Sequence, residues 1–367
     1  MGVIIPYLGV FLDARGFSSV EIGQLTAFIT LARIIGPHLW ANFSDKSGKN
    51  LKMLQLGCLL SLGCFSLVFY LDSFWALSIS IGLMMMFISA ILPQIEVLTL
   101  SCVNGHGGRY GRIRLWGSIG YILLTIATGT MIDHFSTEAP VYITSLILLT
   151  LLLSTCFLTE PNITRELLCQ KDSIWPKLKA PIFICFIFSA MLLQMSFGPY
   201  YSFFALYAKD LGYSGQATGW LIATGVMVEV IIFIFAGGLI KRFGVKNLLL
   251  LSISLTAVRW SLLAYYADSL FFLLLSQMLH AFSFGMTHVA SIHFIHLYFG
   301  KNFQSRGQAI YISVAFGLGG AVGGFIAGEL WQQGRGAEMT FLFASLSALI
   351  SAVFLLPIAR KRMNGAV

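Results

Sequence analysis

Among the ionisable side chains inside long apolar stretches of the sequence are Arg33, Glu229 and Arg259. A charge at the centre of a bilayer costs roughly 2.5–3.5 kcal/mol on insertion scales, so each of them requires a partner or a function. Glu229 and Arg259 lie at a similar depth in consecutive stretches, which favours an ion pair. Two interpretations remain open: a static pair that locks this part of the chain, or a carboxylate that takes up a proton when its partner charge is released.

A polar stripe follows further along the chain, where Gln277, His280, Phe284, His288 and Ser291 recur at spacings of 3, 4, 4 and 3. Residues at these spacings lie on one face of a helix. Such a face is unfavourable against lipid, so we predict that it borders a cavity or another helix. Histidine titrates near neutral pH and both donates and accepts hydrogen bonds. His280 and His288 are therefore candidates for cavity lining, with simple packing as the alternative.

The rest of the composition indicates a membrane protein. Hydrophobic residues make up 57% of the 367 positions and charged residues only 10%, whereas soluble domains carry about 25% charged residues. The apolar residues form blocks long enough to cross a hydrocarbon core of about 30 Å. Backbone groups in lipid must be satisfied within each segment, which predicts an all-α membrane protein. The blocks lie near 19–42, 51–71, 74–102, 112–133, 140–158, 180–208, 216–240, 248–267, 270–299, 307–330 and 339–358.

The basic residues behind the net charge of +8 are unevenly distributed along the chain. Of the 23 Lys and Arg residues, 18 fall in alternate loops and the C-terminal tail. This bias follows the positive-inside rule, so both termini should face the cytoplasm and no nucleic acid is required. The six cysteines have no metal-site or disulfide-scaffold spacing. We predict no metal, no cofactor and no enzyme activity, because no nucleophile–base spacing is present.

An internal repeat organises the chain. After a shift of 196 positions, Gly16-Phe17-Ser18 falls on Gly212-Tyr213-Ser214, and Gly23 falls on Gly219. The repeat predicts two pseudo-symmetric six-helix bundles, as in transporters built from parallel repeats. The expected domains are an N-terminal bundle at 1–158, a cytoplasmic linker at 159–179 and a C-terminal bundle at 180–367. The same shift leaves the first helix truncated, with about 16 residues expected to be missing at its N-terminus.

The segment from Ala41 to Lys49 resembles the loop motif between helices 2 and 3 of the major facilitator superfamily. That motif has Gly, three residues, Asp, a basic residue, any residue, Gly and another basic residue; Ala41 replaces its first Gly. The matching positions, with their counterparts in the second half, are Asp45, Lys46, Gly48, Lys49, Arg242 and Gly244. We expect the aspartate to approach a neighbouring helix end and the lysines to hold the loop at the cytoplasmic face.

Several further segments are similar to the phenylpropionate permease family, relatives of the nucleoside:proton symporters. They are Tyr110-Gly111-Arg112-Ile113-Arg114-Leu115-Trp116-Gly117-Ser118, Val228-Glu229-Val230-Ile231-Ile232-Phe233, Val258-Arg259-Trp260, Leu279-His280 and Thr287-His288. The resemblance covers nearly the whole chain and implies the major facilitator fold. It also implies that the second helices of the two halves meet. Because Glu229 falls on Arg33 in the repeat, Arg33 becomes a second candidate partner for Glu229.

Other positions are candidates for gating or for contact with a ligand. Glu96 and Arg114 both lie near the predicted cytoplasmic surface, where we expect a gate pair. Pro199 breaks the seventh span beside two aromatic hydroxyls, which suits an amphipathic ligand. The aromatic candidates for the substrate cavity are Tyr200, Tyr201, Trp116 and Trp260.

The leading hypothesis is a proton-coupled symporter of a small organic solute, in a bacterial inner (cytoplasmic) membrane and monomeric by analogy. The resemblance implies an aromatic carboxylate such as 3-phenylpropionate, neutralised by Arg259 or Arg33. Glu229, with His280 or His288, would carry the proton. The alternatives are a nucleoside or sugar symporter, in which the arginines are structural, and a transport-inactive truncated membrane protein.

Overall fold

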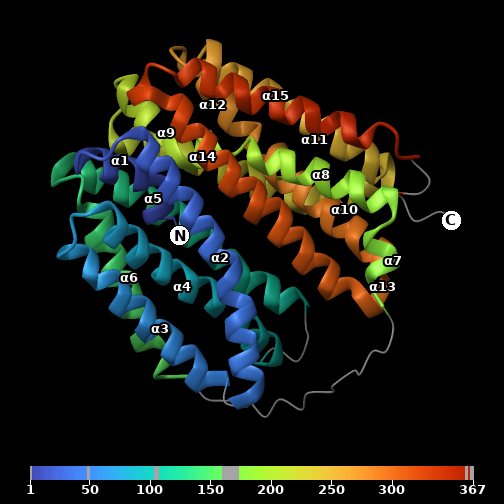
Figure 1. The fold of residues 1–367 in the computed structure, drawn as a ribbon, viewed down its shortest axis with the longest axis horizontal. Helices are drawn as coiled ribbons and strands as arrows, with labels where there is room; N and C mark the ends of the chain where they lie inside the picture. The colour runs from blue at the N-terminus through green and yellow to red at the C-terminus, as the bar shows by residue number, and fades with distance from the viewer. Residues whose placement is uncertain (1, 48–49, 103–106, 159–172, 360–362, 364–367) are drawn as a thin grey trace.

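The computed structural model describes residues 2–47, 50–102, 107–158, 173–359 and 363, and every regular element among them is helical (Figure 1). The N-terminal half contains α1 (Ile4–Ala14), α2 (Ser19–Ser47), α3 (Asn50–Ser66), η1 (Leu67–Phe69), α4 (Phe74–Cys102), α5 (Gly107–His134) and α6 (Ala139–Thr155). The C-terminal half contains α7 (Trp175–Leu178), α8 (Pro181–Met195), α9 (Gly198–Asp210), α10 (Gly215–Phe243), α11 (Val245–Tyr265), α12 (Leu270–Met278), η2 (Ala281–Met286), α13 (Thr287–Tyr311), η3 (Ile312–Gly319), α14 (Gly320–Trp331), η4 (Gln332–Gly334) and α15 (Ala337–Leu355).

The predicted spans agree with these helices, with two local differences. Ten helical stretches of the described chain are long and apolar enough to cross a bilayer, and α1 and α6 are shorter apolar helices. The break expected at Pro199 is present, since the span predicted at 180–208 divides into α8 and α9 just before this proline, which has no N–H for the helical ladder. Gly300 turns the chain inside α13 with a φ of 65°. The spans on either side of that corner each contain a π-helical segment, η2 and η3.

Glycines decide which helices of the two halves pack together. The most extensive contacts between the halves are α2 with α14 and α5 with α10, followed by α1 with α9. A Cβ atom on Gly23 of α2 would lie only 2.6 Å from the Cα of Gly328 in α14. Gly129 of α5 and Gly215 of α10 are packed as closely. The expectation that the two second helices, α2 and α10, meet each other is therefore wrong, because each pairs with a glycine-bearing helix of the other half instead.

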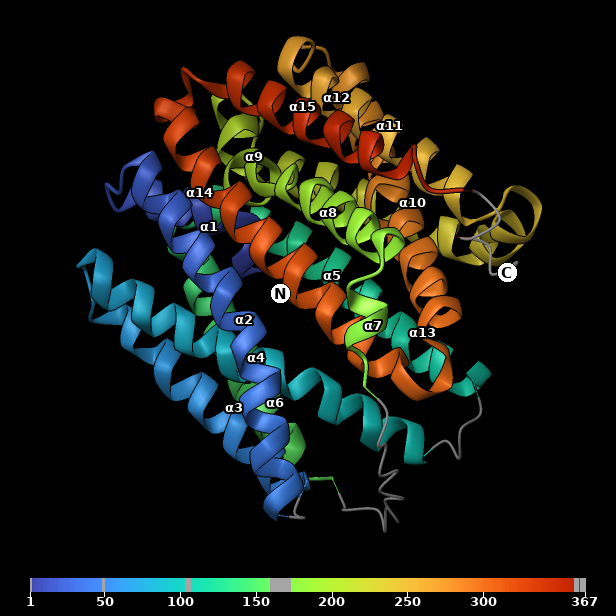
Figure 2. The ribbon, with the colours of Figure 1, turned by 45° about the vertical axis from the view of Figure 1, so that its right-hand side comes forward.

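The two ends of the molecule differ. We call the end next to the linker, where α2 and α10 finish, the linker end, and the opposite end the far end. The halves diverge toward the linker end (Figure 2). At the far end the halves are joined by the Gln333 N–H, which donates to Ser19 Oγ at 2.9 Å, and by Lys209 Nζ and Asp13 Oδ2 at 3.6 Å.

The second-half counterpart of the loop motif is described, whereas the first is not. Gly48 and Lys49 lie outside the described residues, as do the side chains of Asp45 and Lys46, so their expected role stays a prediction. Gly244 has a φ of 79° and ends α10 while starting α11. Arg242 lies over the ring of Phe243 with 5.2 Å between the guanidinium carbon and the ring centroid.

Arg15 connects three elements at the far end of the N-terminal half. Its guanidinium donates to both carboxylate oxygens of Glu138, at 2.8 Å and 3.0 Å, beside the start of α6. It also donates to the backbone oxygens of Val68 and Leu71 after α3, at 3.3 Å and 2.9 Å. A bidentate arginine–carboxylate pair is among the stronger hydrogen-bonded arrangements in proteins.

We expect Arg15→Ala to lower the free energy of unfolding by roughly 1.5–3 kcal/mol, because Glu138 and two carbonyls lose their donor. Thermal unfolding of the purified protein in detergent measures the change. Arg335→Ala is the control, since Arg335 is an exposed arginine of a far-end loop. Equal melting temperatures for the two variants would contradict the assigned role.

Candidate functional site

The contact between Glu229 and His280 is the centre of the site. Glu229 extends from the middle of α10, and His280 stands where α12 passes into η2. Glu229 Oε2 and His280 Nε2 are 3.5 Å apart, and the two side chains are only 12% and 9% exposed. A carboxylate and an imidazole are both proton acceptors, and at this distance they form an ion pair when the imidazole carries a proton.

This contact replaces the ion pair that the sequence favoured. Among the described residues Glu229 forms no ion pair with Arg259 or with Arg33. Counting residues along the helices placed Glu229 and Arg259 at the same depth in the membrane. Equal depth does not make the two side chains face each other, because that depends on the rotation of each helix about its axis. Instead α10 packs along η2, which directs Glu229 to His280.

Two glycines allow α10 and η2 to approach closely enough for Glu229 to reach His280. A Cβ atom on Gly285 would lie 2.9 Å from Glu229 Cγ and 3.0 Å from Ile232 Cγ2. A Cβ atom on Gly225 would lie 3.2 Å from His280 Cβ. Both glycines therefore leave the space that the Glu229 and His280 side chains occupy. Sequence reasoning did not identify them, although Gly225 lies four residues before Glu229 and Gly285 lies five residues after His280, a spacing of about one helical turn that was a usable signal.

Arg259 is fully buried and is surrounded by aromatic rings. Its guanidinium carbon lies 4.3 Å from the ring centroid of Trp260, 4.4 Å from that of Tyr200 and 5.8 Å from that of Phe197. Among the described residues, no partner lies at good hydrogen-bonding geometry to its three side-chain nitrogens. The rings offer cation–π stabilisation of about 2 kcal/mol or more when desolvated. No carboxylate among the described residues is paired with this arginine.

The aromatic rings beside Arg259 are fixed by hydrogen bonds of their own. Tyr200 donates to Gln277 Oε1 at 2.9 Å, and the Trp260 indole donates to Ser196 Oγ at 3.0 Å. Tyr200 and Gln277 were both predicted to line the cavity, and the structure brings them together. Trp260 is completely buried, so it forms part of the wall behind Tyr200 rather than a surface open to a ligand.

The predicted stripe continues from His280 toward the linker end as a column of rings. His280 stacks on Phe284 with 5.7 Å between centroids, and Phe284 stacks on His288 with 6.0 Å. The widened π-helical turn of η2 carries the middle of this column, and such turns are frequent at functional sites. Nδ1 of both histidines is buried, and it has no hydrogen-bond partner within the described part of the chain.

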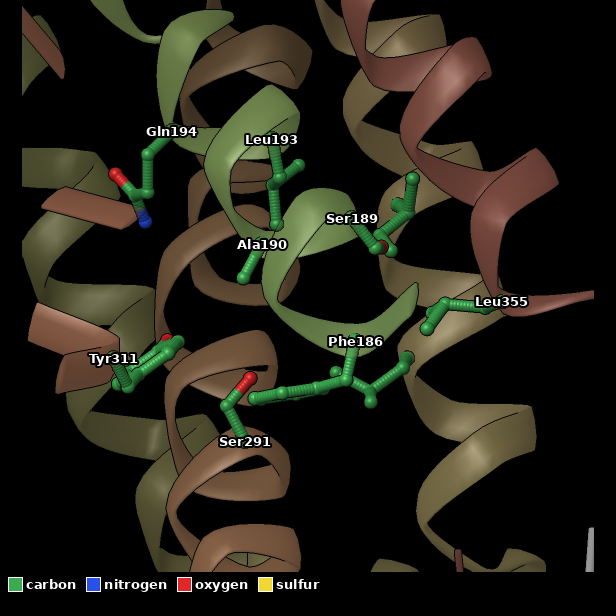
Figure 3. A pocket seen from close by; sticks show the side chains of 10 residues that line it. Phe186, Ser189, Ala190, Leu193, Gln194, Ser291, Tyr311 and Leu355 are labelled. Atoms are coloured by element: carbon green, nitrogen blue, oxygen red, sulfur yellow. The ribbon is translucent and has the colours of Figure 1, made fainter. Parts of the chain in front are cut away.

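Below His288 the stripe reaches a narrow cavity inside the C-terminal half. Ser291 and Tyr311 of α13 line one side of it together with Gln194 of α8, and Ser189 and Leu355 lie on the other side (Figure 3). A water molecule in such a space needs two or more polar partners, and these side chains offer them.

The N-terminal half contributes a different set of groups. Arg33 of α2 follows Thr26 and Thr30 on the helix face that contacts α14. Its side chain is exposed and lies within electrostatic range of Tyr201 of α9, which is itself 36% exposed. Trp116 of α5 is 71% exposed.

The expected pair of Glu96 and Arg114 is present, at 2.5 Å between Glu96 Oε1 and an Arg114 terminal nitrogen. Both residues belong to the N-terminal half, on α4 and α5, so the pair does not itself join the two halves. Arg114 also lies within electrostatic range of His288 in the other half. Its role as a gate remains a prediction.

Two helical halves that meet around ionisable groups at mid-span are the arrangement of a secondary transporter. The chain belongs to the MFS_1 like family, part of the major facilitator superfamily, whose family model matches residues 1–343. The fold is the major facilitator fold. The nucleoside transporter NupG superposes with a TM-score of 0.86 over 97% of this chain and 95% of that one, at 18% identity.

Curated relatives are also transporters. A probable 3-phenylpropionic acid transporter of Escherichia coli is 30% identical over 95% of this chain and 92% of its own length. The maltose permease of Geobacillus stearothermophilus is 29% identical over 98% of this chain and 91% of its own length. The protein is therefore a multi-pass membrane transporter of small molecules.

We expect Gly285→Ala to separate Glu229 from His280, because the added methyl group takes the space of Glu229 Cγ. Infrared difference spectra between acidic and neutral pH would show the C=O stretch of the Glu229 carboxyl, identified by its absence in Glu229→Gln. The band should shift in frequency, because His280 no longer lies beside the carboxyl. Gly238→Ala in α10 is the control, since a Cβ atom there meets no atom within 4 Å. An unmoved band in Gly285→Ala would contradict the assignment.

Proposed function

We propose that this transporter imports a small aromatic carboxylate together with a proton, by alternating access of its two halves. The contact between Glu229 and His280 carries the proposal, since it provides a proton-binding pair deep in the C-terminal half. The positive-inside bias supports a cytoplasmic linker end, with both termini inside. The far-end contacts between the halves then correspond to a state closed to the outside.

Charge balance explains how the proton and the substrate would be linked. With Glu229 ionised and His280 neutral, the carboxylate offsets the buried charge of Arg259. A proton on Glu229 removes that offset and adds one positive charge to the region, which also contains Arg33, so the attraction for a substrate carboxylate becomes stronger. Each ligand then favours the binding of the other by the same factor, since such coupling is reciprocal.

Burial separates the roles of the two arginines. Arg259 is fully buried behind Tyr200 and so acts as a fixed charge in the wall. Arg33 is exposed, and among the described residues it has no hydrogen bond or ion pair. We therefore assign the direct contact with the substrate carboxylate to Arg33, with Tyr201 beside it. The relative described as a 3-phenylpropionic acid transporter supports an aromatic carboxylate as substrate.

A neutral substrate is the second candidate, because the maltose permease is nearly as similar over the same length. The described groups around Glu229 favour the carboxylate. Sugar recognition relies on several free hydrogen-bonding side chains, and the Gln277 carbonyl oxygen already accepts from Tyr200. If the substrate were neutral, Arg33 would have only a structural role.

We expect Glu229→Gln to abolish gradient-driven accumulation of 3-phenylpropionate while leaving downhill equilibration. One carboxylate entering with one proton is electroneutral, so one pH unit across the membrane sustains about a tenfold accumulation in the original protein. Uptake of labelled substrate into liposomes, with and without an inward proton gradient, measures this. Asp268→Asn, at an exposed loop position, is the control. Accumulation that persists in Glu229→Gln would remove Glu229 from the proton path.

We expect Arg33→Gln to raise the KM for 3-phenylpropionate by about 10- to 100-fold, the loss of a hydrogen bond between charged groups. Arg33→Lys should retain part of the affinity because it keeps the charge and loses the planar fork. Initial uptake rates over a range of substrate concentrations measure both variants. An unchanged KM in Arg33→Gln, with saturable transport of a neutral nucleoside or sugar, would favour the neutral-substrate alternative.

A further inference from the structure

Asp133 connects the two halves at the far end. It lies near the C-terminus of α5, in the N-terminal half, while its carboxylate accepts hydrogen bonds from the first turn of α10. The Gly215 N–H donates to Oδ1 at 2.6 Å and the Gln216 N–H donates to Oδ2 at 2.8 Å. The first N–H groups of a helix have no partner within the helix, and they carry partial positive charge.

The rest of the first turn of α10 shows why this carboxylate matters. Ser214 is the N-cap, and its Oγ accepts from the Ala217 N–H at 3.1 Å. The two N–H groups between them are satisfied from the other half of the protein. Separation of the halves would therefore expose these two N–H groups and the Asp133 carboxylate to water.

Close backbone packing brings the carboxylate into reach. Gly129 lies one turn before Asp133, and the backbone of α10 passes directly over it at Gly215. A Cβ atom on Gly219 would lie 2.9 Å from Ile126 Cα, so the close approach continues along both helices. Tyr7 adds a hydrogen bond from its hydroxyl to Thr125 O at 2.9 Å.

The internal repeat supplies an equivalent position without this link. The shift of 196 residues places Asp133 on Glu329 and Ser214 on Ser18. The first turn of α2 is capped within its own segment, because Ser18 Oγ accepts from the Glu21 N–H at 3.3 Å and the Ser18 N–H donates to Glu21 at 2.8 Å. Glu329 is exposed and forms no hydrogen bond or ion pair among the described residues.

The two first turns also differ in sequence. Where α2 has Glu21, α10 has Ala217, so α10 lacks the carboxylate with which Glu21 accepts the N-cap N–H of Ser18. The only carboxylate bonded to the first turn of α10 among the described residues is that of Asp133, which accepts from the next two N–H groups. One of the two pseudo-symmetric interfaces thus carries a charged link and the other does not.

We propose that Asp133 is a latch between the two halves, which stabilises the closed far end by capping α10 and releases it when that end opens. The latch does not depend on the identity of the substrate, so it is testable on the purified protein alone. Its removal shifts the equilibrium between the closed and open far end, while the fold of each half is retained.

The test measures a distance across the far end. Ser73 and Ser269 are exposed residues at the far end, one in each half. In a cysteine-free background both are replaced by cysteine and carry spin labels in lipid nanodiscs. Asp133→Asn removes the charge, and we expect it to raise the ratio of long to short distances by about three- to tenfold, as for a lost charge-assisted hydrogen bond.

The control is Glu329→Gln, which neutralises the equivalent acid of the other interface and should leave the distance distribution unchanged. Monodisperse elution and an unchanged helical circular dichroism spectrum establish that each variant is folded. An unchanged distribution in Asp133→Asn, or an equal shift in Glu329→Gln, would overturn the latch.

A second variant tests the same contact from the other side. Gln216→Pro removes the N–H donor that Oδ2 accepts while the Asp133 charge stays, and proline is well tolerated in the first turn of a helix. It should shift the distances in the same direction. Because the two changes act on one contact, the double variant should shift them by less than the product of the single effects. Independent, multiplicative effects would overturn the proposal.

Discussion

A guanidinium buried among rings, without a paired carboxylate, is the constraint that organises the C-terminal half. The desolvation penalty for a buried ion remains several kcal/mol after relaxation. Cation–π contacts with Tyr200 and Trp260 return about 2 kcal/mol or more in a dry site. The desolvation penalty therefore exceeds the cation–π stabilisation, and hydrogen bonding does not offset the difference, since no described residue lies at good hydrogen-bonding geometry to the three nitrogens of Arg259. A negative charge nearby lowers that cost, and Glu229, reached through His280, is the group that offers it.

The helix packing of this region also places Glu229 beside His280. Gly225 and Gly285 allow α10 to approach η2, and the π-helical turn widens the helix where His280 and Phe284 stack. A wide turn and small residues weaken a helix in isolation, because they reduce packing and regular hydrogen bonding. Their presence together, beside an ionisable pair, is better explained by the position of Glu229 than by stability of the span.

The sequence was sufficient for the spans and for the stripe, because both depend on periodicity alone. The helix predicted at 74–102 is α4 with the same bounds, and the spacing of His280 and His288 placed them in one column. The partner of Glu229 was not accessible in this way. Depth along a helix follows from counting residues, whereas rotation about the helix axis and the choice of neighbouring helix depend on tertiary packing, here on glycines. The break between α8 and α9 was signalled only by Pro199.

The repeat also shows why the polar groups gather in one half. After the shift of 196 residues, Arg259 falls on Gly63, His280 on Met84 and Gln277 on Ile81. The N-terminal half thus keeps the fold and lacks the network. A buried polar network is favourable only while its members stay satisfied. A network that crossed the interface would be disrupted whenever the halves separate, whereas one contained in a single half persists. The interface itself is left to glycine contacts and exposed polar caps, which separate at much lower cost.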